Sequence, residues 1–113
     1  MRVKRKVVYI CSPYSGDVER NVKKAYAYCR DVIKNGCIPI APHLFFPQFL
    51  NDDIPEEREL ALSMNKELIL RCDEVWVFGD TVSKGMSEEI EFARAWEKII
   101  HHIVYIAEDK NET

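Results

Sequence analysis

Four short runs of apolar residues are spaced along the chain, each bounded by polar or turn-forming residues. They are rich in β-branched and aromatic residues, which is typical of strands. The predicted strands are Lys6–Cys11, Cys37–Ala41, Glu74–Phe78 and His102–Ala107. Strands in which apolar residues follow one another without polar alternation are expected where both faces of a sheet are covered.

Between these runs, apolar positions recur at steps of three and four residues, the spacing of one face of a helix. The predicted helices are Val18–Lys34, Glu56–Cys72 and Met86–Ile100. The apolar face of the first helix consists of Val18, Val22, Ala25, Tyr26, Cys29 and Ile33. Asn35 and Gly36 supply a typical stop after it.

The segment His43–Pro55 is predicted to be a loop, and it is unusually apolar. Its large apolar residues are Leu44, Phe45, Phe46, Phe49 and Leu50. Such a loop must pack against something, so we expect a lid, a pocket wall or a subunit contact.

Strands and helices therefore alternate, which predicts an α/β fold. We expect one domain over residues 1–113: a small doubly wound, flavodoxin-like or Rossmann-like parallel sheet of about four strands, in the order 2-1-3-4, with helices on both faces. Ligands of such sheets bind beyond the C-terminal strand ends, where the strand order reverses. Two loops meet there, Ser12–Asp17 and Gly79–Glu89.

Composition and charge limit the classes of molecule that the chain is expected to bind. The formal net charge of −3 argues against a nucleic acid polymer, and the basic cluster Arg2–Lys6 fits a solvated strand start better than a phosphate contact. No apolar run approaches the roughly 20 residues of a membrane helix, so we expect no membrane partner. Four separated cysteines and the lack of a signal-peptide pattern favour reduced thiols and a cytoplasmic protein.

Several common chemistries of α/β domains lack their residues here. The first loop is not a Gly-x-Gly-x-x-Gly motif, and Walker and Gly-x-Ser-x-Gly motifs are absent. The first strand ends in Ile10-Cys11, without the aspartate of a phosphoacceptor. No His, Cys or Asp spacing matches a metal site. We therefore expect neither a cofactor nor a metal.

The two loops offer specific groups. Ser12, Ser15 and Gly16 lead into a helix N-terminus, which holds phosphates or sugar hydroxyls well. Capping of that helix by Ser15 or Asp17 explains the same residues equally well. In the later loop Gly85 permits close backbone approach to a ligand.

Two acidic residues follow Gly85. Glu88 and Glu89 are expected in the first turn of the last helix, where the helix dipole stabilises an ionised carboxylate that can act as a nucleophile. Ordinary helix-start composition is the alternative interpretation.

Three segments together resemble a known family. They are Tyr9-Ile10-Cys11-Ser12-Pro13, then Cys72-Asp73-Glu74-Val75-Trp76-Val77, then Ser83-Lys84-Gly85-Met86-Ser87-Glu88-Glu89-Ile90-Glu91-Phe92-Ala93. They are similar to motifs of the nucleoside 2-deoxyribosyltransferase superfamily, which includes nucleotide N-glycosidases. The resemblance spans most of the chain, although each motif is short.

The resemblance implies roles for particular residues. Glu89 falls on the nucleophile, Tyr9 on a tyrosine that approaches it, and Ser83 on a serine that binds a 5′-phosphate. The other substrate-binding residues expected on the two loops are Ser12, Tyr14, Ser15, Gly16, Gly79, Gly85, Met86 and Ser87.

The chain also departs from the family pattern. Asn65 stands where the family has an aspartate that helps to protonate the leaving base, and Glu91 replaces a glycine. The chain is shorter than typical members, without the C-terminal residues that complete a neighbour's site.

Six other residues have side chains that could act as acids, ligands or caps. Asp73 is expected to cap the preceding helix, at the end of the sheet away from the site. His43 follows the second strand, so it is either a ligand or acid at the site or a plain loop histidine. Asp52 and Asp53 are alternative sources of the missing acid. His101 and His102 are expected to begin the fourth strand, without a function.

Together these points predict an enzyme that cleaves an N-glycosidic bond, or transfers a (deoxy)ribosyl group, on a nucleoside or nucleotide through Glu89. The alternative is a non-catalytic module of the same fold that binds a nucleotide or sugar phosphate. We expect a small-molecule partner and a homo-oligomer, because the Leu44–Leu50 stretch is apolar and the resembled family shares sites between subunits.

Overall fold

The computed structural model describes residues 4–104. Its sheet contains four parallel strands: β1 (Val7–Cys11), β2 (Ile38–Ile40), β3 (Glu74–Phe78) and β4 (Ile99–Ile103). They lie in the order β2-β1-β3-β4. This confirms the predicted α/β fold class and strand order. Tyr9, near the centre, pairs with Ile40 on one side and Val75 on the other.

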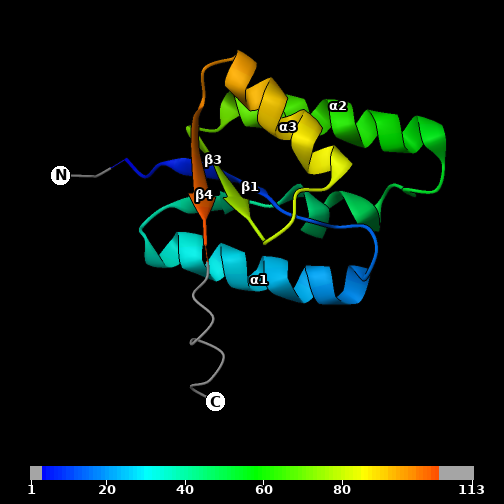
Figure 1. The fold of residues 1–113 in the computed structure, drawn as a ribbon, viewed down its shortest axis with the longest axis horizontal. Helices are drawn as coiled ribbons and strands as arrows, with labels where there is room; N and C mark the ends of the chain where they lie inside the picture. The colour runs from blue at the N-terminus through cyan, green and yellow to red at the C-terminus, as the bar shows by residue number, and fades with distance from the viewer. Residues whose placement is uncertain (1–3, 105–113) are drawn as a thin grey trace.

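Helices cover both faces of the sheet. α1 (Val18–Lys34) lies on one face, and α2 (Pro55–Arg71) and α3 (Lys84–Ala95) lie side by side on the other (Figure 1). All three helices begin at the same end of the molecule, at the right in Figure 1. In a parallel βαβ arrangement this is the end at which the strands finish.

Alternation along β1 divides the core between the two faces. Val8 and Ile10 pack toward α1 with Tyr28 and Val32. Tyr9 and Cys11 point the other way, into the cluster shared with α2 and α3. Successive strand side chains point to opposite faces, and this puts the Tyr9 hydroxyl on the same side as α2 and α3.

The end of α3 differs from the prediction. The helix stops at Ala95, not at residue 100, because Glu97 adopts a left-handed conformation with φ 57°. β4 consequently begins at Ile99, three residues before the predicted start at His102. A glycine or asparagine would have marked this stop, whereas glutamate carries no such signal. The rest of the predicted strand, residues 105–107, and the polar tail, residues 108–113, lie outside the described residues.

The buried face of α1 is also shifted from the predicted one. Its buried residues are Ala25, Tyr28 and Val32. Tyr26 and Ile33, assigned to the apolar face from spacing, are 57% and 59% exposed. The ring of Tyr28 stacks on Phe78 of β3 with centroids 4.3 Å apart. Tyrosine suits either a buried or a half-exposed position, so hydropathy alone did not separate these faces.

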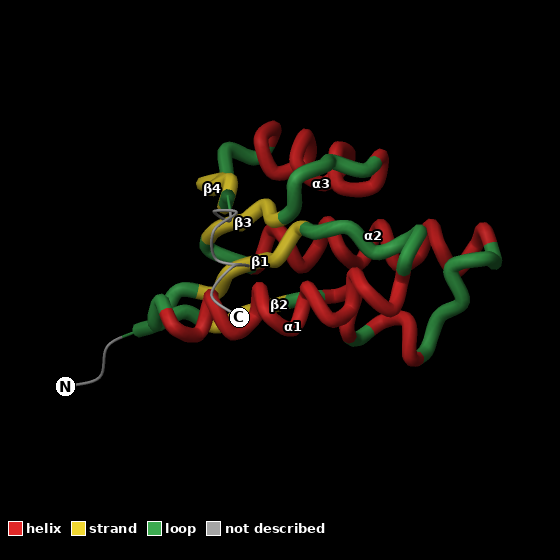
Figure 2. Tube along the Cα trace, turned by 60° about the horizontal axis from the view of Figure 1, so that its bottom comes forward, coloured by secondary structure: helices red, strands yellow, loops and turns green. Residues whose placement is uncertain are grey.

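The predicted loop between β2 and α2 is partly helical. It contains two short 3-10 helices, η1 (Pro42–Leu44) and η2 (Phe46–Gln48). The ring of Phe45 packs against Phe46 and Phe49, with centroids 5.5 and 5.0 Å away. Phe45 therefore packs on two aromatic neighbours within the segment, and Phe46 and Phe49 also line the cavity described below. Figure 2 shows the segment, in green and red, between β2 and α2.

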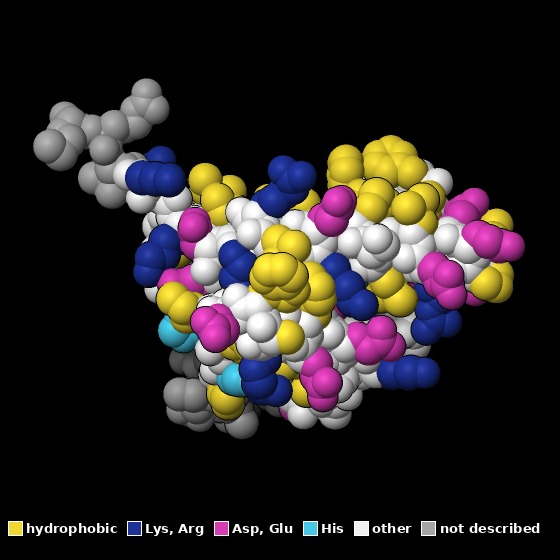
Figure 3. Space-filling view, turned by 90° about the horizontal axis from the view of Figure 1, so that it is seen from above, with side chains coloured by type: hydrophobic (Ala, Val, Ile, Leu, Met, Phe, Trp, Pro, Cys, Tyr) yellow, Lys and Arg dark blue, Asp and Glu magenta, His cyan; other side chains and the backbone are white. Residues whose placement is uncertain are grey.

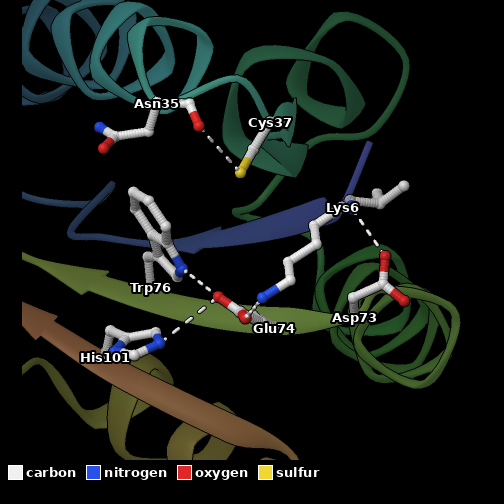
Figure 4. Close-up of polar contacts among 8 residues, drawn as sticks. Lys6, Asn35, Cys37, Asp73, Glu74, Trp76 and His101 are labelled. Atoms are coloured by element: carbon white, nitrogen blue, oxygen red, sulfur yellow. Dashed lines mark hydrogen bonds and ion pairs between the residues drawn. The ribbon is translucent and has the colours of Figure 1, made fainter. Parts of the chain in front are cut away.

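A buried carboxylate organises the opposite end of the sheet. Glu74, 5% exposed, accepts hydrogen bonds from Trp76 Nε1 and Lys6 Nζ, each at 2.9 Å, and lies 3.4 Å from His101 Nε2 (Figure 4). The hydrogen bond from Trp76, followed by that from Lys6, lowers the pKa of Glu74. These contacts account for a charge that burial alone would disfavour.

Two predictions at this end were wrong in detail. Asp73 does not cap α2; its Oδ2 accepts a 2.7 Å hydrogen bond from the Val7 amide and ties β3 to the start of β1. His101 and His102 do not begin β4 but lie in its middle, paired with Trp76 and Val77. The prediction missed this because the start of β4 had been placed three residues too late.

Candidate functional site

A cavity of about 1070 Å³ opens at the end of the sheet where the strands finish. Its walls come from the β1–α1 loop, the 3-10 segment, the first three turns of α2 and the start of α3. The topology therefore brings together the two loops predicted to meet there. Most of the predicted site residues line this cavity: Ser12, Tyr14, Ser15, Gly16, His43, Asn65, Ser83, Gly85, Met86 and Glu89.

Glu89 is the buried acid of this cavity. It is 2% exposed, yet it lines the wall. The helix begins at Lys84, and no acidic residue lies in its first turn, so the expected first-turn position of Glu88 and Glu89 was wrong. Both lie in the second turn, where the dipole acts weakly.

The charge state of Glu89 follows from burial. Burial raises the pKa of the Glu89 carboxyl, and the hydrogen bond from Asn65, then the nearby Tyr9 hydroxyl and Cys11 thiol, and the charge of Lys66 oppose that rise. The prediction that the helix dipole would favour the ionised form was therefore also wrong. A carboxyl whose pKa is raised by burial holds its proton to a higher pH than an exposed glutamate does.

Asn65 is the direct partner of this acid. Its Nδ2 donates to Glu89 Oε2 at 3.1 Å, and Asn65 is itself 4% exposed. Tyr9 is completely buried and does not line the cavity, so it approaches Glu89 from within the core. Tyr9 Oη, Asn65 Oδ1 and Glu89 Oε1 have no hydrogen-bond partner within residues 4–104. Unpaired buried polar atoms are uncommon, and they concentrate where function requires them.

The β1–α1 loop contributes a preformed wall. Ser12 is 2% exposed, and Asn21 Nδ2 donates to the carbonyls of Tyr14 and Ser15 at 3.0 and 3.1 Å. Asp17 caps α1, accepting from the Arg20 amide at 3.2 Å. The sequence left open whether this helix start binds a ligand or is capped by Ser15 or Asp17; the structure shows capping, by Asp17.

The turn before α3 is likewise capped. Ser83 Oγ accepts a hydrogen bond from the Met86 amide at 3.2 Å and so caps the N-terminus of α3. Ser87 is exposed and does not line the cavity. Gly79 does not line it either: at φ 105° it turns the chain beside Pro13, and a Cβ there would lie 3.3 Å from Pro13 Cδ. The backbone conformation of this turn is therefore sufficient to explain the glycine at position 79.

His43 faces the cavity from η1. Its ring stacks on Tyr14 with centroids 5.2 Å apart. Burial lowers the pKa of His43, while Asp52 and the Ser12 backbone partly oppose the change. The imidazole is therefore favoured in its neutral form, as a hydrogen-bonding group on the wall facing the ligand space. Asp52 and Asp53 line the same cavity and are exposed.

Charged residues along the cavity are mainly acidic. Six carboxylates line it, against two cations, Arg58 and Lys84. The acidic residues are Asp52, Asp53, Glu57, Glu59, Glu88 and Glu89. Sequence reasoning missed Arg58, although a signal existed: Arg58, Leu62 and Asn65 are spaced to share one face of α2. Lys84, within the segment Ser83–Ala93 that resembles the family motif, also lines the cavity.

The described part of the chain holds no group of three or more His, Cys, Asp or Glu side chains suited to a metal ion. Within residues 4–104, each helix is too short or too polar to cross a bilayer.

Comparison with known proteins gives a family and a fold. A family described as a domain of unknown function (DUF7768) matches residues 6–103. No curated protein matches the chain.

Solved 2-deoxyribosyltransferases share the fold. One, from the psychrotolerant bacterium Bacillus psychrosaccharolyticus, superposes with a TM-score of 0.64 at 19% identity, over 88% of this chain and 77% of that one. Another, from Leishmania mexicana, gives a TM-score of 0.65 at 14% identity, over 96% of this chain and 72% of that one. At these identities the similarity is one of fold, and it confirms the structural resemblance read from the motifs.

Proposed function

Because the chain belongs to the DUF7768 family and has the fold of 2-deoxyribosyltransferases, we propose that it cleaves or transfers the N-glycosidic bond of a nucleoside, with Glu89 as the nucleophile. The observation that carries this proposal is the position of Glu89. It is a buried carboxyl with a side-chain donor, and it faces a cavity at the end of the sheet.

The proposed chemistry is nucleophilic substitution at the sugar. A Glu89 oxygen attacks C1′, the bond from C1′ to the base nitrogen breaks, and the base leaves with the bonding electrons and gains a proton. The resulting glycosyl ester is then resolved by water, in hydrolysis, or by a second base, in transfer. Asp52 and Asp53 line the cavity and are the proposed sources of the proton. His43, favoured in its neutral form, is proposed to hold the base or sugar by a hydrogen bond.

The acidic cavity supports an uncharged nucleoside over a nucleotide. Six carboxylates against two cations stabilise the positive charge that develops on the sugar ring and repel a 5′-phosphate. At each of the two helix starts that could hold a phosphate, a side chain already caps one backbone amide, Asp17 at α1 and Ser83 at α3. We therefore propose that the expected phosphate role of Ser83 is absent and that Ser83 serves to start α3.

The test is a substrate panel. Purified protein is incubated with ribo- and 2′-deoxyribonucleosides and their 5′-monophosphates, with and without a second free base, and the free and exchanged bases are measured by chromatography. We expect release or exchange from a nucleoside, about tenfold or more above the matching monophosphate, a difference of about 1.4 kcal/mol. Faster cleavage of monophosphates would contradict the charge argument.

A non-catalytic binding module is the second candidate, and Asn65 favours it, because an amide does not supply a proton as a carboxylic acid does. The same panel separates the two functions when melting temperature is recorded alongside. A ligand present at 100 times its Kd stabilises the fold by about 2.7 kcal/mol. Stabilisation by a nucleoside without free base after several hours would support the binding module.

We also propose that the protein forms a homo-oligomer through its aromatic segment. Phe45 and Phe49 are 56% and 63% exposed. Hydrophobic side chains also gather in patches on the face formed by α2 and α3 (Figure 3). Contiguous exposed apolar surface favours a subunit contact.

The oligomer proposal is tested by light scattering after size exclusion. We expect the wild-type mass to exceed that of one chain, and Phe49→Ser to reduce it toward the monomer. Tyr26→Ser, a change at a 57% exposed residue of α1, is the matched control and should leave the mass unchanged. A monomeric wild-type protein at tens of micromolar would refute the proposal.

A further inference from the structure

Three buried polar side chains from three elements converge behind the cavity. They are Tyr9 on β1, Asn65 on α2 and Glu89 on α3, which are 0%, 4% and 2% exposed. One hydrogen bond joins them, from Asn65 Nδ2 to Glu89 Oε2 at 3.1 Å. One polar atom of each side chain has no partner within the described residues.

We propose that Asn65 is a positioning residue that holds Glu89 as an oriented carboxylate, and that it is not a proton donor to the leaving base. The inference rests on the proposed function in which Glu89 is the nucleophile. An amide N–H offers an anion a hydrogen bond without competing for its proton. It also leaves the second carboxylate oxygen, Oε1, buried and without a hydrogen-bond partner within the described residues, so the lone pairs of Oε1 are not engaged.

The orientation of the amide supports this assignment. With Nδ2 toward Glu89, a donor faces an acceptor. The flipped amide would set Oδ1 against a carboxylate oxygen, which is repulsive unless the acid is protonated. Asn65 therefore favours the ionised form of Glu89 and fixes the direction of its carboxylate.

Of the groups around Glu89 that favour its ionised form, Asn65 contributes most. From β1, the Tyr9 hydroxyl and the Cys11 thiol face the carboxyl, and from α2, Asn65 and the charge of Lys66 do. Glu88, next to it on α3, is exposed and lines the same cavity. Among the groups that lower the pKa of Glu89 against burial, the Asn65 hydrogen bond ranks first.

An aspartate at position 65 would reverse this effect. Two carboxylates within hydrogen-bond distance in a buried site do not both ionise, because each raises the pKa of the other. Asn65→Asp is nearly isosteric, so it changes charge and donor capacity with little change in packing. Asn65→Leu removes the donor without adding a charge.

The test follows Glu89 directly, by carbon NMR of protein labelled at the glutamate side-chain carboxyl. The Glu89 signal is identified by its absence from Glu89→Gln. We expect its titration midpoint to rise in Asn65→Leu and to rise further in Asn65→Asp. Asn51→Asp, the same change at a cavity residue with no hydrogen bond to Glu89 in the structure, is the control and should shift the midpoint less.

Base release provides a second readout. In Asn65→Asp we expect a loss of about tenfold at the acid end of the pH profile, recovering toward alkaline pH as the acid ionises. Folded Asn65 variants whose Glu89 midpoint equals that of the wild type would overturn the proposal. If no nucleoside is turned over, the proposed function fails, and the NMR titration still decides whether Asn65 controls Glu89.

Discussion

Glu89→Gln is expected to abolish base release and base exchange while the protein stays folded. Glutamine keeps the shape of the side chain and can accept the hydrogen bond from Asn65 Nδ2, but an amide is too weak a nucleophile to form the glycosyl ester. Loss of a nucleophile commonly costs a factor of roughly 10³ or more in kcat. The measurement is release of free base at substrate saturation, by chromatography.

Glu91→Gln is the matched control for this loss. Glu91 lies on the same helix and is exposed, but it does not line the cavity. Its rate should equal that of the wild type. If Glu89→Gln kept the wild-type turnover, Glu89 would not be the nucleophile. The exposed carboxylates that line the cavity, among them Asp52 and Glu88, would then have to be tested in its place.

The same substitution is expected to stabilise the protein at alkaline pH. Burial raises the folded-state pKa of Glu89 above its ordinary value of 4.5. The folded state therefore binds this proton more tightly than the unfolded chain does, and stability falls as the pH rises from about 4.5 through the folded-state pKa. Above that window the wild type contains a buried anion, and the glutamine variant does not.

The stability difference should therefore depend on pH. At pH 8, Glu89→Gln should melt above the wild type. Relief of one poorly paired buried group is worth about 1 kcal/mol, which corresponds to about 4–8 °C in a domain of this size. Below about pH 4, Glu89 is largely protonated in both the folded and the unfolded wild-type protein, so the Tm values of the wild type and the variant should converge.

Circular dichroism melts across this pH range check the prediction, with Glu91→Gln as the control for loss of a surface charge. A Glu89→Gln variant that melts below the wild type at pH 8 would contradict it, since that result would mean that the ionised carboxylate contributes favourably to the fold. Together the two predictions describe one trade-off, in which a costly buried acid is kept for its chemistry.

The strand order and the end of the sheet at which the cavity opens were predictable from sequence. β3 was predicted with its observed bounds, and β1 to within one residue, because unbroken apolar runs such as Val7–Cys11 give a local signal that needs no tertiary partner. The alternation of strands and helices then required parallel pairing, and the reversal of strand order indicated which loops would meet.

Local signals failed where a residue was governed by distant contacts. Glu97 ends α3 in a left-handed conformation that its residue type does not announce, and this displaced the predicted start of β4. The resemblance to known motifs drew attention to Glu89 and Asn65, but it gave neither their hydrogen bond nor their burial. Arg58 was missed because its place on the cavity wall depends on how α2 lies over the sheet.

The sequence by itself determined the α/β fold class, the order of the strands and the end of the sheet at which the cavity opens, since these follow from periodicity and the geometry of parallel connections. Only the tertiary structure decided the burial of Glu89, its hydrogen-bond partner and the direction in which its pKa shifts. The sequence placed it at a helix start favouring an anion. The fold instead sets it against Tyr9 and Asn65, where loss of solvation opposes the charge and one amide donor supports it. Burial and hydrogen-bond partners come from residues far apart in the chain, so a sequence pattern does not specify them.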